Sequence, residues 1–275
     1  MQTRTLAVAA MLALTGPAAL AADLPVSVAA APPYWPRTWD WTGFYGGINA
    51  GYSFGKERDG WNIIAPPPST FAVIGTDAET LRGPLGGIQA GFNVQVSYFL
   101  FGFESDIDFA GETGKHTFNS ASTTPNLVTG ISIPHSDRLN WIGTARGRLG
   151  VAFGQALIYG TAGFAWAAGR EQVSGTATRV QDGSTVVLIT PSNLNTIMTG
   201  WTAGAGAELA LDNNWTVRAE YLYVDFGTTN RGFPTQPVPT VLGIGTVVPA
   251  GSGTLSARIT DNIVRLGLNW KFQPF

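Results

Sequence analysis

The sequence predicts an all-β protein, an eight-stranded antiparallel up-and-down transmembrane β-barrel. Eight segments alternate apolar and polar residues with period two, and tight turns and long connections alternate between these segments. The composition agrees with this fold class. Of the 275 residues, 44% are hydrophobic, only 12% are charged and 35 are glycines, a balance that is unusual for a soluble enzyme.

Residues 1–21 have the features of a secretory signal peptide. Arg4 supplies a positive charge, Leu6–Leu14 is an apolar run, and Ala19 and Ala21 are small residues at the expected cleavage positions. The run is too short to cross a bilayer about 30 Å thick as a helix, and no later stretch reaches the roughly 18 apolar residues that a helical span needs. Because the chain has no cysteine, its exported form must be stabilised without disulfides, and a closed barrel would supply that stability.

Residues 22–40 separate the signal peptide from the barrel, which is predicted over residues 41–275. The segment is rich in proline and alanine and has no period, so we expect an extended linker on the periplasmic side. The net charge of −2, without any cluster of Lys and Arg, excludes a nucleic-acid-binding surface.

Each predicted strand has one apolar face and one face of glycine, amide, hydroxyl and charged side chains. In chain order, the strands lie at residues 44–54, 87–96, 99–109, 140–153, 156–170, 201–209, 215–223 and 264–272. Their apolar faces include Phe44 and Ile48, Ile88 and Phe92, Phe99 and Phe103, Trp141 and Leu149, Trp201 and Leu209, Trp215 and Val217, and Leu266 and Trp270. The fifth segment, Ala156–Arg170, is apolar on both faces, so its register stays open.

The connections between the strands alternate in length. Tight turns are predicted at Ser97, Gly154–Gln155 and Asp212–Asn214. Long loops rich in Ser, Thr, Gly and Pro are predicted at residues 56–80, 112–137, 171–196 and 228–256. Outer-membrane barrels have short periplasmic turns and long extracellular loops, so this alternation favours such a barrel over a soluble one.

The apolar faces are predicted to contact outer-membrane lipid, because Arg or Lys on that side costs about 2–4 kcal/mol at the bilayer midplane. Aromatic residues gather near both strand ends, as interfacial belts do. The periplasmic belt contains Phe44, Phe153, Trp215, Trp270 and Phe272, and the outer belt contains Phe54, Trp141, Trp166, Trp201 and Tyr223.

The polar faces then line the lumen and carry balanced charges. An eight-stranded barrel has an interior just wide enough for its side chains, so we expect these groups to form a paired network rather than an ion-conducting path. The predicted network consists of Glu104, Asp106, Asp108, Arg146, Arg148, Glu208, Arg218, Glu220, Arg265 and Lys271.

Five stretches carry a family resemblance. They are "WTGFYGGINAGYSFG" at residues 41–55, "GFESDIDFAG" at 102–111, "WIGTARGRLGVAF" at 141–153, "YGTAGFAWA" at 159–167 and "AEYLYVDFG" at 219–227. Together they resemble the small Gram-negative outer-membrane immunogenic proteins, members of the porin family with an OmpA-like eight-stranded barrel. "ADLP" at Ala22–Pro25 is similar to the mature start of that family. The resemblance implies a surface-exposed barrel in the cell outer membrane, without shared catalytic residues; some members bind haemin or support envelope integrity.

The expected function is mainly structural. We expect exposed loops that meet host or envelope components, with a possible contribution to envelope integrity. The alternatives are a narrow porin-like channel for small solutes or ions and a surface site for haemin that uses His116 and His135.

No enzymatic activity or cofactor is expected, because neither histidine falls in a predicted strand, where a Ser–His pair acting on lipid would have to lie. Near Glu112 and Asp137, the two histidines are expected to be solvated loop residues rather than metal ligands.

The C-terminus resembles the assembly signal that outer-membrane barrels present to the barrel-assembly machinery. Arg265, Gly267, Trp270 and Phe272 fit its order of a polar residue, a glycine and two alternate apolar positions. Pro274 has no backbone N–H to extend a ladder. We therefore expect Phe272 to end the last strand and residues 273–275 to form a short periplasmic extension.

Overall fold

The protein is described by a computed structural model that covers residues 39–64, 72–124, 127–179, 185–235 and 252–272. The predictions for the signal peptide, for linker residues 22–38 and for residues 273–275 concern parts of the chain outside these ranges.

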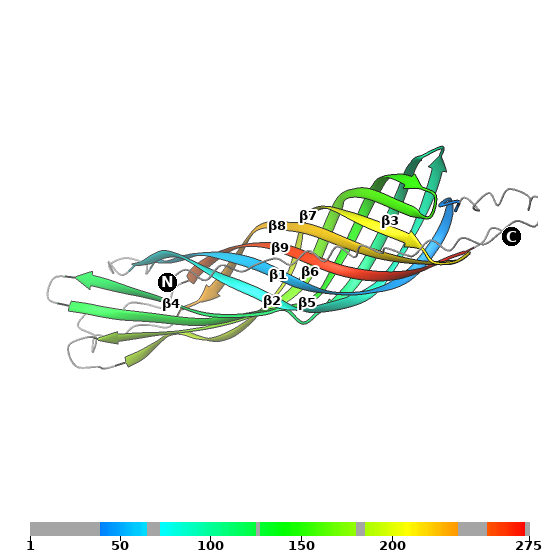
Figure 1. Cartoon of the computed structure of the whole chain (residues 1–275). Coiled ribbons are helices and arrows are strands. Elements are labelled where there is room, and N and C mark those ends of the chain that lie inside the picture. The colour runs from blue at the N-terminus through cyan, green and yellow to red at the C-terminus, as the bar shows by residue number, and fades with distance from the viewer. Residues whose placement is uncertain (1–38, 65–71, 125–126, 180–184, 236–251, 273–275) are drawn as a thin grey trace, which may run out of the picture. The chain divides into compact units, whose positions relative to one another are not determined.

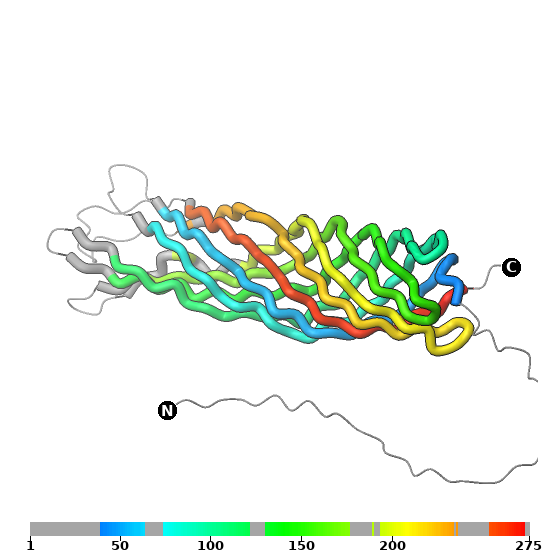
Figure 2. Tube along the Cα trace, turned by 45° about the horizontal axis from the view of Figure 1, so that its top comes forward, coloured from blue at the N-terminus to red at the C-terminus, as the bar shows by residue number. Residues whose placement is uncertain are grey.

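The described residues form nine strands, all paired antiparallel (Figure 1). They are β1 (Gly43–Ile64), β2 (Ala72–Val96), β3 (Phe99–Ala110), β4 (Thr113–Thr124), β5 (Leu127–Phe153), β6 (Ala156–Arg179), β7 (Thr185–Ala210), β8 (Trp215–Pro234) and β9 (Ser252–Lys271). Strand β1 pairs with both β2 and β9, so the sheet closes on itself; in Figure 2 the last strand (red) lies beside the first (blue). Within the described ranges there is no helix with the length and apolar character needed to cross a bilayer.

The nine strands occupy eight positions around the ring, because β4 continues the line of β3. Strand β3 pairs with β2 and β5, and β4 pairs with β5 along its whole length but with β2 only at Arg82 and Thr113. Across the break, Gly111 N–H donates to Pro84 O at 2.9 Å and Leu139 N–H donates to Glu112 O at 3.1 Å. The predicted eight-stranded up-and-down barrel is therefore confirmed.

The three predicted tight turns are present. Ser97, with a φ of 58°, and Gly154, with a φ of 64°, adopt the left-handed conformation that short hairpin turns require. In the third turn, Asp212 Oδ1 accepts hydrogen bonds from the N–H groups of Asn214 at 2.8 Å and Trp215 at 2.9 Å. Local turn chemistry thus closes this end of the barrel.

The prediction of four long loops is wrong over most of their length. Strands continue through these segments, leaving only residues 65–71, 125–126, 180–184 and 235–251 between strands. We divide the barrel wall into an outer region and a membrane region. The outer region comprises the strand parts at residues 56–64, 72–80, 113–124, 127–137, 171–179, 185–196, 228–234 and 252–258, and the membrane region is the rest of the wall. The alternation persists in the outer region, but its large apolar residues face inward, with the exception of Ile74, so Ser-, Thr- and Gly-rich outer faces give the sequence a loop-like composition.

The membrane region has the predicted faces. Phe44 is 64% exposed and Phe109 is 73% exposed on the outside, whereas Arg146 and Arg265 are buried inside. The structure also supplies the register of β6, where Leu157 and Tyr159 face the lumen and Ile158 faces outward.

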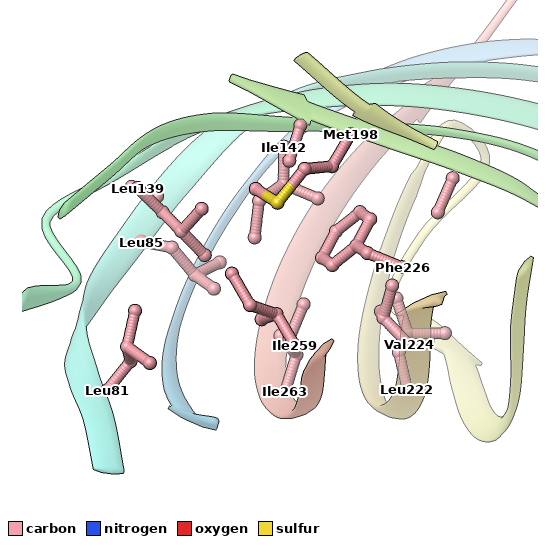
Figure 3. Packing of buried hydrophobic residues seen from close by; sticks show 13 residues of the cluster. Leu81, Leu85, Leu139, Ile142, Met198, Leu222, Val224, Phe226, Ile259 and Ile263 are labelled. Carbon is pink, nitrogen blue, oxygen red and sulfur yellow. The ribbon is translucent and has the colours of Figure 1, made fainter. Parts of the chain in front are cut away.

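Three buried apolar layers divide the lumen, which the sequence had indicated to be polar. The periplasmic layer contains Trp41, Leu100, Ala152, Leu157, Tyr159 and Ala210, with Trp39 packed against it. The middle layer contains Leu81, Leu85, Ala110, Leu139, Ile142, Ala165, Ala167, Met198, Leu222, Val224, Phe226, Ile259 and Ile263. The outer layer contains Trp61, Ile63, Phe118, Ile131, Ile133, Val173, Ile189, Phe233 and Leu255. Figure 3 shows Leu139, Ile142, Met198 and Phe226 of the middle layer pointing toward one another.

Candidate functional site

The membrane region contains a buried charge network centred on Arg146 of β5. One guanidinium nitrogen, Nη2, lies 2.6 Å from Glu104 Oε1 and 2.7 Å from Asp106 Oδ2. The other, Nη1, lies 3.1 Å from Glu220 Oε1. Strands β3 and β8 supply these carboxylates, so a single side chain links three strands across the lumen.

Three further arginines extend the network. Arg265 Nη2 lies 2.8 Å from Asp106 Oδ2 and 2.7 Å from Glu220 Oε2, and its Nη1 lies 2.8 Å from Asp108 Oδ2. Arg148 Nη2 lies 2.8 Å from Glu208 Oε2, and Arg218 pairs with Glu104. The structure thus brings together nine of the ten residues predicted for the network.

Lys271 is the tenth, and the prediction was wrong in placing it with the others. It ends β9 at the periplasmic mouth, where its Nζ donates a hydrogen bond to the backbone oxygen of Asp40. The same nitrogen lies 5.4 Å from the centre of the Trp39 ring. Alternation along β9 put Lys271 on the lumen face correctly, but it is too near the strand end to reach the buried carboxylates.

Two tyrosines belong to the network, and the sequence analysis missed them. Tyr45 donates a hydrogen bond to Glu104 Oε2 at 2.6 Å, and Tyr159 donates one to Glu220 Oε1 at 3.0 Å. Each tyrosine stands opposite a glycine in the ladder, Gly91 or Gly206. A Cβ at either glycine would lie within about 2.5 Å of the tyrosine hydroxyl oxygen, so the glycines provide the space for the rings. The sequence signal for these tyrosines was a tyrosine on the polar face of one strand opposite a glycine on the polar face of the neighbouring strand.

The outer region contains a second cluster of charged groups, with a different composition. Five carboxylates, a histidine and an arginine lie buried or half-buried in its interior: Glu57, Asp59, Glu79, His135, Asp137, Glu171 and Arg231. His135 Nε2 lies 3.2 Å from Asp59 Oδ2 and 3.9 Å from Glu79 Oε2. Arg231 pairs with Glu171. We call this group the acidic cluster.

The ionisation of the acidic cluster reflects burial and the excess of carboxylates. Burial, together with the charges of Glu57 and Glu171, raises the pKa of Asp137 to about 10. Burial lowers the pKa of His135, but the hydrogen bond and charge of Asp59, together with other nearby carboxylates, outweigh it and raise this pKa to about 9. Burial and the charge of Asp59 raise the pKa of Glu57. The cluster therefore retains protons that isolated carboxylic acids would release.

The structure corrects the expectation that both histidines and their acidic neighbours are solvated loop residues. His135 and Asp137 are buried on β5, and Glu112 is buried at the break between β3 and β4. His116 lies on β4, with its side chain 43% exposed and its Nε2 3.0 Å from Asp77 Oδ1. The missed signal was the inward series Ile131, Ile133, His135, Asp137 and Leu139, which has period two but is shifted by one residue from the rest of β5 at the irregularity between Leu139 and Trp141.

The four residues of the expected assembly signal lie on or directly after β9. Arg265 and Gly267 face the lumen, where a Cβ at Gly267 would lie 2.9 Å from Arg218 Nε. Trp270 faces outward, with its ring centre 4.8 Å from that of Trp215. The strand ends at Lys271, one residue earlier than expected, although Phe272 N–H still donates to Phe44 O at 2.9 Å.

Comparison with known proteins agrees with the closed barrel. The family model described as "Outer membrane protein beta-barrel domain" matches residues 7–272. The chain belongs to this family. It is an outer-membrane β-barrel protein of the immunogenic-protein type, located in the cell outer membrane.

Two relatives and two solved structures illustrate the similarity. The 31 kDa outer-membrane immunogenic protein of Brucella melitensis biotype 1 is 33% identical over 98% of this chain and 100% of its own length. The 22 kDa outer membrane protein of Rhizobium leguminosarum bv. viciae is 27% identical over 84% of this chain and 78% of its own length. OprG from Pseudomonas aeruginosa has a TM-score of 0.46 at 10% identity, covering 86% of this chain and 99% of that structure. Neisserial surface protein A has a TM-score of 0.34 at 13% identity, covering 84% of this chain and 98% of that structure.

Proposed function

We propose that this protein is a closed, mainly structural barrel that stabilises the envelope and presents its outer region at the cell surface. The observation that carries the proposal is the filled lumen. Along β5, Ala152 lies in the periplasmic layer, Arg146 and Arg148 lie in the charge network, Ile142 lies in the middle layer and Ile133 lies in the outer layer. A solute would have to separate buried ion pairs and cross three apolar layers, and both steps are costly.

Surface presentation is supported by the extension of the wall beyond the lipid-facing band. Exposed polar side chains cover the outer region, including Lys56, Arg58, Lys115 and Gln172. The Brucella relative carries the description "immunogenic", and we extend a surface role of that kind to this chain. Lipid would contact the membrane region, and host or envelope components would contact the outer region. The proposal includes no catalytic step, because His116 and His135 both lie beyond the lipid-facing band.

Planar-bilayer recording tests the closed barrel. Refolded full-length protein should show no discrete conductance. Arg146→Ala should also stay silent in the fraction whose heat-modifiable gel mobility shows a folded barrel, because the three apolar layers still fill the lumen, and exposed Arg58→Ala is the matched control. Discrete channels in the wild type would overturn the proposal in favour of a narrow porin.

A surface ligand site is the second candidate, and one observation favours it. His116 and Lys115 line a cavity of about 770 Å³ with Pro134 and Gln172, a volume suited to a small ligand. Haemin titration should saturate with the wild type and weaken at least tenfold with His116→Ala. If the two titrations coincide, His116 is not a haemin ligand.

We also propose that the barrel-assembly machinery reads the end of β9. Phe272→Ala should slow membrane insertion, whereas deletion of residues 273–275 should not. The reverse result would move the signal to the last three residues.

A further inference from the structure

We propose that the outer region binds one divalent first-row transition-metal cation, with Glu79, His135 and Asp137 as ligands. Strand β2 supplies Glu79, and β5 supplies His135 and Asp137. Each offers one donor atom, and the three atoms lie within 4.8 Å of one another. Bonds of about 2.0–2.2 Å around a tetrahedral ion would place the donors about 3.3–3.6 Å apart, so the side chains would have to close by no more than about 1.5 Å.

Hydrogen bonds do not satisfy the donor atoms. Among the described residues, neither oxygen of Glu79 nor Oδ2 of Asp137 has a hydrogen-bond partner of normal geometry, and the contact of His135 Nε2 is an ion pair with Asp59 Oδ2 at 3.2 Å. The side chains of Glu79 and His135 are at most 3% exposed. Polar groups buried to this degree are normally satisfied, so these atoms point to a missing ligand.

The orientation of His135 suits a metal ligand. Its Nδ1 lies 3.4 Å from the backbone oxygen of Ile133, a contact in which Nδ1–H donates to the carbonyl. An ion would displace the Nε2 proton, and the lone pair of Nε2 would then bind it while Nδ1–H stays on the carbonyl, as in other histidine-ligated metal sites. Gly114 contributes space, because a Cβ there would lie 2.6 Å from Glu79 Oε1.

The carboxylates around the donors retain protons when no ion is bound, and a cation would displace those protons. Glu57 and Asp59 add two more carboxylates beside the three ligands, and both oxygens of Glu57 are buried without a hydrogen-bond donor in the described parts of the chain. The arginine of the cluster, Arg231, pairs with Glu171. A divalent ion would compensate the excess and join β2 to β5 between the middle and outer apolar layers.

The donor set indicates the class of ion. One imidazole nitrogen with two carboxylate oxygens suits Zn²⁺ or Mn²⁺, whereas Ca²⁺ takes six to eight oxygen ligands.

The experiment is calorimetric titration of Zn²⁺, and separately Mn²⁺, into full-length refolded barrel after chelation. The wild type should bind one ion, and Zn²⁺ should raise its unfolding temperature. Glu79→Gln, Asp137→Asn and His135→Asn should each weaken binding by at least about tenfold. The matched control is His116→Asn on the paired strand β4, which should bind as the wild type does.

A stability readout separates loss of a ligand from loss of folding. In chelator, Glu79→Gln removes like charge and Asp137→Asn replaces a carboxyl group that holds its proton, so both should unfold at or above the wild-type temperature, while losing the rise with Zn²⁺. The proposal is overturned if neither ion binds saturably, if binding survives all three ligand variants, or if His116→Asn abolishes it. None of these results would affect the closed-barrel proposal, which rests on the charge network and the apolar layers.

Discussion

The membrane region and the outer region belong to one continuous sheet but have opposite polarity. In the membrane region, Phe44 and Phe109 face outward and Arg146 faces inward. In the outer region, Trp61 and Ile133 face inward and Lys56 faces outward. Period two makes both regions strands, and the surrounding solvent sets which face is apolar: lipid reverses the arrangement that water imposes.

The two regions also treat buried charge differently. In the membrane region, five carboxylates face four arginines, and the described contacts link them into one network. In the outer region, five carboxylates face one arginine and one histidine. The first group is nearly neutral by itself, whereas the second gains from an added cation.

The largest expected effect is in the charge network. Arg146→Ala leaves Glu104, Asp106 and Glu220 short of a partner and should lower the free energy of unfolding by about 3–5 kcal/mol. Denaturant titration in detergent or lipid measures this change in the free energy of unfolding. Exposed Arg58→Ala should stay within about 0.5 kcal/mol of the wild type. Equal effects of the two substitutions would mean that the network does not stabilise the barrel.

The reversal of polarity predicts a second contrast. Phe103→Arg puts a charge on the lipid-facing side and should cost about 2–4 kcal/mol near the midplane. Asn62→Arg, also on the outside but in the outer region, should cost less than about 0.5 kcal/mol. Folding free energies in lipid vesicles compare the two variants. A penalty for Asn62→Arg as large as that for Phe103→Arg would place residue 62 in the membrane.

Packing of glycine against tyrosine provides a smaller test. Gly91→Ala would place a Cβ 2.4 Å from the Tyr45 hydroxyl oxygen and should cost about 1–3 kcal/mol through overpacking. Gly60→Ala in the outer region is the control, because its nearest neighbour would be Ser256 Cβ at 3.6 Å. Gly91→Ala should lower the unfolding midpoint more than Gly60→Ala does, and coincident midpoints would contradict the steric argument.

The smallest expected effect is at the periplasmic turn. Hydrogen bonds from the N–H groups of Asn214 and Trp215 lower the pKa of Asp212. Because the folded pKa is lower than the unfolded one, the ionised carboxylate stabilises the turn above the ordinary pKa, and this contribution is lost as pH falls through the lowered pKa. NMR titration of Asp212 measures the shift. Asp212→Ala should lower the stability of the barrel slightly at pH 7 and leave it unchanged at a pH below the lowered pKa.

The sequence was sufficient for the turns and for most strand faces of the membrane region. Phe44 and Ile48 alternate with Tyr45 and Asn49, and Ser97 and Gly154 provide turn chemistry, so faces and turns follow from local rules. The outer region was missed because Ser, Thr and Gly on its wet face gave a loop-like composition, although Trp61 and Ile63 kept the period. The register of β6 was not readable, because small and apolar residues occupy both of its faces.

Alternation along the chain identified which side chains enter the lumen, since it depends only on neighbouring residues. The partners of those side chains depend on how the closed sheet staggers its strands. Closure brings Arg146 to carboxylates from two other strands, and it brings Glu79 to His135 and Asp137 across the outer interior. It also places Lys271 at the mouth and away from the network. Contacts across a barrel join residues far apart in sequence, and their distances follow from strand tilt and register, which a local pattern does not encode.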